Sequence, residues 1–381
     1  MHKNIFSDYN SILDVHFVQI NPSLKEFQKY TSIQLYLINV YLLINLTIEF
    51  FNGGYYLRAI IPAAGFGTRL KPHTYSLPKV LLNVGGKPIL GHIIDKLLEE
   101  GITKATFVIG YLGEKIVQYV KKEYPNLSSS FIEQEIALGL GHAIYTAIPT
   151  FDDDEIFIIL GDTIFDVNLK SVFSKKISSL GVKTVDDPSR FGVAVCEDGK
   201  IVKLIEKPID LISKLALVGL YYISNSKLLS ESLNELFVNN IKTNGEFQLT
   251  DSLQIMIEKG ESITTFNVDG WYDCGKPETL LSTNRYLLSK SGTNRRIENV
   301  LINDPVFIAE NAFIRNSVIG PFATISDNCE ISSSIICNSI ISSGAKIDKA
   351  MLENSIIGNN AVVRSHYRKL NTGDSSEIEF N

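Results

Sequence analysis

The sequence predicts a mixed α/β protein with a mostly parallel sheet, helices on both faces of that sheet, and a short parallel β-helix at the C-terminal end. Short apolar runs alternate with segments of helical periodicity between residues 59 and 160. Isoleucine then recurs every five or six residues from Ile302 onward. With 381 residues, 45% of them hydrophobic and 20% charged, the chain is long enough for two domains with buried cores.

Residues 1–56 differ in composition from the rest, because they contain neither Ala nor Arg. The stretch Ile33 to Phe51 is apolar, but Gln34, Asn39 and Glu49 inside it argue against a membrane span. We therefore interpret residues 1–56 as an N-terminal extension outside the folded domain, and we expect no membrane contact. A start of translation near Leu57 and an accessory helix are both open alternatives.

The stretch Arg58 to Pro88 joins an apolar strand at 59–63 to a glycine turn. Residues with little or no side chain, which let backbone N–H groups approach a polyphosphate, are Ala64, Gly65 and Gly67. Residues that add hydrogen-bond donors or positive charge are Thr68, Arg69 and Lys79. The pattern has neither the Lys-Ser/Thr of a P-loop nor the third Gly of a dinucleotide fingerprint. It predicts a different kind of nucleotide site.

The chain continues as alternating helices and strands. A helix is expected from Pro88 to Gly101, followed by strand 104–111, helix 114–123, strand 130–134, helix 142–148 and strand 156–160. In such a sheet, ligands bind where the parallel strands end. Asp162 directly follows the most apolar of these strands, so its carboxylate is expected in the ligand crevice. Mg²⁺ is its natural partner, since Mg²⁺ takes carboxylates, phosphate oxygens and water.

The pattern G-x-G-T-R-L, with Pro-Lys ten residues past Thr68 and Lys-Pro at 87 and 88, resembles the sugar nucleotidyltransferases, also called NDP-sugar pyrophosphorylases. The resemblance runs from Leu57 to the C-terminus. It implies a Rossmann-like core and nucleotidyl transfer from a nucleoside triphosphate to a sugar 1-phosphate. Through GLGHA, WYDCGKPETLL and a terminal TGDSSEIEF, the chain is most similar to long-form glucose-1-phosphate thymidylyltransferases. A uridylyltransferase, a mannose-1-phosphate guanylyltransferase and a non-catalytic regulatory homologue are the alternatives.

The resemblance also implies roles for individual residues. A pyrimidine base would be held by Gln134, Gly139 and Leu140, because the Gln amide can both donate to and accept from the base edge. His142, in the same stretch, is interpreted as a packing or capping residue. Arg69, Lys79 and Asp162 would be the catalytic residues, and Mg²⁺ would be shared by Asp162 and Asp273.

The segment from 190 to 222 is similar to the sugar side of these enzymes. The residues expected to bind the sugar phosphate are Gly192, Glu206, Lys207 and Gly219. One departure is Asn244, where relatives usually carry Arg, and Lys242 is its candidate replacement. No general base is required, since a sugar phosphate is already an ionised nucleophile at neutral pH.

Charge and cysteine usage limit the remaining classes of function. A net charge of −6 gives no basic field for nucleic acid, so small anionic substrates must be met by local charge. The four cysteines show no CxxC pair, which argues against a zinc site or a disulfide framework. Reduced thiols and a cytoplasmic location are expected.

The twelve periodic positions after the polar segment 291–296 are typical of hexapeptide coils, which form a left-handed parallel β-helix. They are Ile302, Ile308, Ile314, Ile319, Ile325, Ile331, Ile336, Ile341, Ile347, Leu352, Ile357 and Val363. We therefore divide the chain into the extension 1–56, a nucleotidyltransferase domain 57–290 and a β-helix domain 297–381. So few coils favour a structural role in a homo-oligomer over a second enzymatic activity.

Overall fold

The computed structural model describes residues 57–366, except 153–154 and 292–294, together with residues 375 and 377. Within these ranges, no helix is long and apolar enough to cross a membrane. The predictions for the extension 1–56, including the apolar stretch from Ile33 to Phe51, lie outside the described residues. The first described strand, β1, begins at Arg58.

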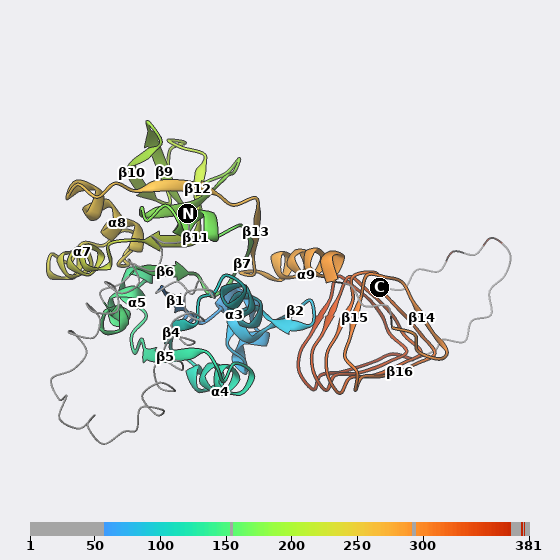
Figure 1. Ribbon diagram of the computed structural model, residues 1–381. Coiled ribbons are helices and arrows are strands. Elements are labelled where there is room, and N and C mark those ends of the chain that lie inside the picture. The colour runs from blue at the N-terminus through green and yellow to red at the C-terminus, as the bar shows by residue number, and fades with distance from the viewer. Residues whose placement is uncertain (1–56, 153–154, 292–294, 367–374, 376, 378–381) are drawn as a thin grey trace, which may run out of the picture. The chain divides into compact units, whose positions relative to one another are not determined.

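A nine-stranded sheet with the order β5-β4-β1-β6-β11-β8-β12-β10-β9 forms the centre of the fold (Figure 1). Its first four strands are parallel, and they are β1 (Arg58–Pro62), β4 (Lys104–Ile109), β5 (Ser128–Glu133) and β6 (Ile156–Ile159). The helices between them are α3 (Ile89–Glu99), α4 (Gly113–Glu123) and α5 (Leu140–Ala147). The predicted alternation of strands and helices is confirmed here to within about two residues.

The other half of the sheet is not parallel, so the prediction of a mostly parallel sheet is wrong for these strands. They are β8 (Ser179–Thr184), β9 (Gly192–Glu197), β10 (Lys200–Glu206), β11 (Leu215–Ile223) and β12 (Thr264–Asn267). Only β8 and β12 pair in parallel; the remaining pairs, including β6 with β11, are antiparallel. The reason is visible between β9 and β10, where Asp198 and Gly199 alone form the turn and leave no room for a crossover helix.

Both faces of the sheet are buried. Neighbouring residues of a strand point to opposite faces, and in β1 Ile61 belongs to one hydrophobic cluster while Ile60 belongs to the other. The first cluster includes α3 and α4, whereas the second includes α5 together with α7 (Ser226–Val238) and α8 (Leu249–Glu258). Helices therefore cover both faces, as the sequence predicted.

The C-terminal residues form three four-stranded parallel sheets around a triangular section (Figure 1). Their strands are β14 (Val300–Ile302), β15 (Phe307–Ile308), β16 (Phe313–Arg315), β17 (Ser317–Ile319), β18 (Thr324–Ile325), β19 (Glu330–Ser332), β20 (Ile335–Cys337), β21 (Ile340–Ile341), β22 (Lys346–Asp348), β23 (Met351–Glu353), β24 (Ile356–Ile357) and β25 (Val362–Arg364). The twelve periodic residues stack in register as three columns, one per sheet, which begin at Ile302, Ile308 and Ile314. Each column contributes to a single apolar core.

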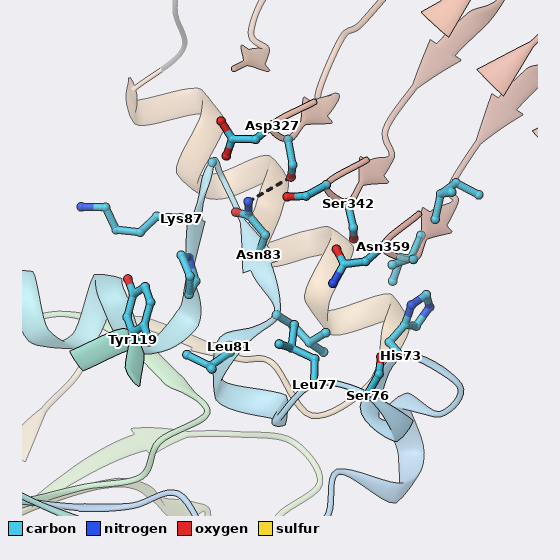
Figure 2. A pocket seen from close by; sticks show the side chains of 18 of the residues that line it. His73, Ser76, Leu77, Leu81, Asn83, Lys87, Tyr119, Asp327, Ser342 and Asn359 are labelled. Carbon is cyan, nitrogen blue, oxygen red and sulfur yellow. Dashed lines mark hydrogen bonds between the residues drawn. The ribbon is translucent and has the colours of Figure 1, made fainter. Parts of the chain in front are cut away.

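The coils contact the nucleotidyltransferase domain through α9 (Pro277–Ser291) and the hairpin of β2 (Asn83–Val84) with β3 (Lys87–Pro88). The buried Asn284 of α9 accepts hydrogen bonds from the Gly85 N–H, at 2.8 Å, and from the Thr324 hydroxyl, at 2.6 Å. Asn83 donates to Ser326 at 3.0 Å, and Figure 2 shows this side chain reaching from the hairpin toward the coils. A groove of about 1060 Å³ lies beside this contact.

Candidate active site

The glycine loop after β1 is packed directly against the predicted lysine. Gly67 has φ 61°, and a Cβ there would lie 2.9 Å from Thr74 Cγ2 and 3.0 Å from Lys79 Cβ. The Thr74 hydroxyl donates to the Gly67 carbonyl at 2.9 Å. A side chain at position 67 would thus be strained and would push against Lys79. Gly65, in contrast, has no atom within 4 Å of where its Cβ would be, so the loop is open on that side.

Lys79 and Asp162 form an ion pair at the edge of the sheet. Asp162 is carried to the loop because the Gly161 N–H donates to the Pro62 carbonyl at 3.2 Å. The Lys79 side chain is 12% exposed and that of Asp162 is 29% exposed, so the pair is only partly screened by solvent.

The carboxylate of Asp273 is brought next to Asp162 by a short two-stranded antiparallel sheet. Strand β7 (Thr163–Asp166) pairs antiparallel with β13 (Gly270–Asp273), which puts Asp273 opposite Thr163. The Cys274 N–H donates to the Asp162 carbonyl at 3.0 Å. The structure therefore brings Asp162 and Asp273 together, as the resemblance implied.

Arg69 completes a cluster of four charged groups. Both Arg69 and Asp273 lie close to Gly275. A Cβ at Gly275 would lie 2.8 Å from an Asp273 carboxylate oxygen and 3.2 Å from Arg69 Nη2, so only glycine leaves room for both side chains. Burial, and next the negative charge of Asp162, raise the pKa of Asp273, while Lys79 and Arg69 act in the opposite direction. Two carboxylates and two positively charged side chains thus lie close together beside the glycine loop.

These residues fit a magnesium ion that arrives with a phosphate ligand. Among the residues that the structure describes, no group of three or more His, Cys, Asp or Glu side chains could hold a metal alone. Mg²⁺, however, is usually held by one or two carboxylates with phosphate oxygens and water. The repulsion between Asp162 and Asp273, which contributes to the raised pKa of Asp273, is what a divalent cation between them would relieve.

Gln134 lines a cavity of about 280 Å³ beside the glycine loop. Its backbone N–H donates to Ile109 at 2.8 Å, which holds the residue at the end of β5. The amide nitrogen of its side chain is already occupied, with the Gly139 carbonyl at 3.2 Å and the His142 ring at 2.9 Å. The amide nitrogen is therefore engaged within the protein, and the role of this amide toward a base stays a prediction.

Two aromatic rings at the same cavity were missed in the sequence. Phe66 and Tyr111 line it, are 54% and 49% exposed, and have ring centroids 5.9 Å apart. Exposed aromatic faces beside a cavity offer a surface on which a planar ring can stack. Phe66 could have been recognised in the sequence, because it is a large aromatic residue between Gly65 and Gly67. A loop of such small residues cannot bury this ring, so the ring must project from the loop.

The loop that follows Gln134 is held by a distant segment. Gly139 has φ 111°, and a Cβ there would lie 2.5 Å from the Phe247 carbonyl, which also accepts from the Gly141 N–H at 2.8 Å. Leu140 begins α5 directly after this glycine. Asn244, with φ 54°, lies in the exposed turn of the same segment, and the Lys242 ammonium lies over the Phe247 ring, 4.7 Å from its centroid.

The predicted sugar residues form a second group. Gly192 pairs with Glu206 across β9 and β10, and a Cβ at Gly192 would lie 3.0 Å from a Glu206 carboxylate oxygen. Thr250, which the sequence did not reveal, donates to that oxygen at 2.6 Å. The exposed Lys207 has its Nζ 3.7 Å from the other Glu206 oxygen. The group therefore combines one acceptor-rich carboxylate with one mobile positive charge.

Two contacts link the sugar group to the charged cluster. Gly219, at an irregularity in β11 with φ 83°, accepts a hydrogen bond from the Leu160 N–H at 3.0 Å, two residues before Asp162. Trp271, two residues before Asp273, packs edge-on against Phe191 at 5.1 Å between ring centroids. The charged cluster and the predicted sugar-phosphate residues are thus linked through β11 and β13.

Residues 58–290 match the family described as nucleotidyl transferase. The chain belongs to this family. It is 37% identical over 264 residues to the bifunctional protein GlmU of Methanococcus maripaludis. The aligned residues make up 68% of this chain and 61% of that protein. The chain therefore spans less than two thirds of the length of this relative. The resemblance inferred from the glycine loop is confirmed at the level of the family.

Two further proteins are similar over most of their own length. A glucose-1-phosphate thymidylyltransferase of Streptomyces antibioticus is 29% identical over 359 residues, covering 85% of this chain and 99% of that protein. The crystal structure of a putative glucose-1-phosphate thymidylyltransferase from Bacillus anthracis, in complex with a sucrose, is 28% identical with a TM-score of 0.54 and covers 63% of this chain and 98% of that one. These similarities support a sugar nucleotidyltransferase.

Proposed function

We propose that this nucleotidyltransferase transfers a nucleotidyl group from dTTP or UTP to glucose 1-phosphate, with release of pyrophosphate. The observation that carries the proposal is the cluster of Arg69, Lys79, Asp162 and Asp273 beside the glycine loop. Fixed positive charge next to an open backbone loop suits a polyphosphate. Two carboxylates at the same edge suit its magnesium ion.

In this reaction a phosphate oxygen of the sugar phosphate forms a bond to the α-phosphorus of the nucleotide. The bond between that phosphorus and the oxygen that bridges to the β-phosphate breaks, and pyrophosphate leaves with that oxygen. The nucleophile is ionised already, so the protein has to align the two phosphates and neutralise their charge. We assign neutralisation to Arg69 and Lys79. Mg²⁺ held by Asp162 and Asp273 would add Lewis-acid stabilisation of the phosphoryl oxygens.

The two substrates would be bound by two different groups of residues. The cavity at Gln134, with Phe66 and Tyr111 as aromatic walls, would take the base. Glu206 would accept hydrogen bonds from sugar hydroxyls, oriented by Thr250. Lys207 would attract the sugar phosphate as a point charge. The full-length similarity to a thymidylyltransferase supports glucose 1-phosphate as the acceptor.

A panel of substrates tests the proposal. The full chain with Mg²⁺ is incubated with dTTP, UTP, GTP or ATP and with glucose 1-phosphate or mannose 1-phosphate, and pyrophosphate release is measured. We expect dTTP and UTP with glucose 1-phosphate to be the best pairs. Discrimination by buried hydrogen bonds can reach on the order of 10⁴-fold, while the single methyl between thymine and uracil is worth only about 1–3 kcal/mol.

Two outcomes would contradict the proposal in different ways. If GTP with mannose 1-phosphate is the best pair, the base pocket is wrongly assigned and the protein is a guanylyltransferase. If no pair releases pyrophosphate, while titration still detects nucleotide binding, the protein is a non-catalytic regulatory homologue. The Lys79→Met variant serves as the control for background hydrolysis.

A further inference from the structure

The imidazole of His142 is in direct contact with the side chain expected to read the base. Gln134 directly follows β5, and His142 is the third residue of α5. The Gln134 amide nitrogen lies 2.9 Å from His142 Nδ1 and 3.2 Å from the Gly139 carbonyl oxygen. Gln134 is only 8% exposed, so this geometry is held within the protein. His142 is therefore more than the packing residue that the sequence suggested.

The tautomer of His142 follows from its contact with the Gln134 amide. The same amide nitrogen lies beside the Gly139 carbonyl, which can only accept, so this atom is the NH₂ group and donates. A neutral imidazole has one N–H and one acceptor nitrogen. The contact is satisfied when Nδ1 accepts from Gln134 and the proton is on Nε2. The ring of Phe237, with a centroid distance of 5.5 Å, packs against the same imidazole.

With this tautomer, His142 and Gly139 together hold the Gln134 amide in one orientation. The amide NH₂ has two hydrogens, and the two acceptors, Nδ1 and the Gly139 carbonyl, use both. Turning the amide over would place its oxygen against two acceptors, without a proton between them. In the described part of the chain no donor is recorded for the Gln134 oxygen, which leaves it available to the cavity that the residue lines.

We propose that His142 is a positioning residue that holds the Gln134 amide with its oxygen toward the nucleobase, so that the pocket selects a pyrimidine ring with an N–H at position 3. Uracil and thymine carry that N–H. Cytosine has a lone pair there instead and would face the amide oxygen as a second acceptor. The inference rests on the proposed function, because it assumes that this cavity binds a pyrimidine nucleotide.

The test compares UTP with CTP as substrates of the full chain, using glucose 1-phosphate and pyrophosphate release. We expect wild-type protein to prefer UTP in kcat/KM. His142→Leu, which keeps a side chain that can pack there but removes the acceptor, should lower that preference about tenfold, since one hydrogen bond to the amide is lost while that of Gly139 remains. His142→Asn, whose Oδ1 can replace Nδ1 as the acceptor, should restore most of it.

A structural role alone would give a different pattern. Phe237→Leu removes packing from the same imidazole without touching the amide, so it should lower thermal stability and leave the UTP preference unchanged. The effect of His142→Leu should appear as a higher KM for UTP, with a smaller change in kcat. An unchanged preference in His142→Leu, or loss of the preference in Phe237→Leu to the same extent, would overturn the inference.

Failure of the inference is distinguishable from failure of the proposed function. If wild-type protein uses UTP and CTP equally well, the amide is not fixed as described, although the enzyme is a pyrimidine nucleotidyltransferase. This comparison needs no variant, so equal use of UTP and CTP overturns the inference even if His142→Leu does not fold. If wild-type protein uses neither nucleotide and no other pyrimidine triphosphate, the proposed function itself fails.

Discussion

Replacing Lys79 with Met should separate the two roles of its ion pair with Asp162. The change removes the positive charge and keeps a long unbranched side chain, so the packing of Lys79 Cβ against Gly67 is retained. Without Lys79, two neighbouring carboxylates, Asp162 and Asp273, lose one of the two cations that the structure places beside them. Both stability and catalysis should suffer, but by different amounts.

The expected loss of stability follows from the exposure of the pair. Exposed pairs contribute about 0.2–1 kcal/mol, whereas removing one partner of a fully buried pair costs about 3–5 kcal/mol. With side chains that are 12% and 29% exposed, Lys79 and Asp162 lie between these limits. We therefore expect Lys79→Met to lower the free energy of unfolding by about 1–2 kcal/mol. Turnover should fall at least about 100-fold, equivalent to about 2.7 kcal/mol of transition-state stabilisation.

The assay is a double-mutant cycle. Urea unfolding and pyrophosphate release are measured for wild type, Lys79→Met, Asp162→Asn and the double variant, all without and with Mg²⁺. The double variant removes both charges, so it should regain most of the lost stability and stay inactive. Near-normal turnover in Lys79→Met would refute the catalytic assignment. A double variant less stable than either single variant would refute the electrostatic reasoning.

Three further predictions follow from the same geometry. Gly219→Ala should lower stability and turnover, measured by thermal unfolding and pyrophosphate release, because φ is 83° and the new Cβ would lie 2.7 Å from the Leu160 side chain; wild-type values would contradict it. The pKa of Asp273 is raised above its ordinary value of 3.8, so its contribution to the stability of the unliganded protein should be lost as pH rises from 3.8 through the raised pKa; Asp273→Asn should flatten that part of the profile. A chain that ends at Ser291 should unfold at lower temperature and lose activity, because Asn83 loses Ser326, Asn284 loses Thr324 and the core loses Ile340; an equally stable, active product would show that the domain is independent of its coils.

The parts of the fold that were predictable are those whose signals are local or periodic. The strand before the glycine loop is apolar and short, and the twelve residues of the coils repeat at a spacing that only stacked turns explain. Long-range pairing carries no such signal. Strand β12 lies between β8 and β10, although it comes more than fifty residues after either of them, and nothing in its own residues specifies that place.

The same contrast holds within the site. Arg69, Lys79 and Asp162 follow from a motif, and their convergence was expected. Hydrogen bonds between distant side chains were not predictable, because they depend on how whole segments meet. Thr250 reaches Glu206 of strand β10 from helix α8, and Asn284 joins the hairpin at Gly85 to the coils at Thr324. A polar residue inside a helix pattern gives no indication of which distant partner it will satisfy.

The change from parallel to antiparallel pairing explains why the site lies where it does. Strand β6 is the last of the parallel set, so Asp162 follows it at the edge where the loop after β1 also lies. Strand β11 runs antiparallel to β6, and its pairing with β8 is irregular around Gly219, whose carbonyl accepts from the Leu160 N–H shortly before Asp162. Groups suited to phosphate therefore come from the parallel half of the sheet, and groups suited to the sugar come from the antiparallel half. Because the two halves meet at β6 and β11, a distortion of this one pairing would misalign the two phosphates with each other, even with both binding pockets intact.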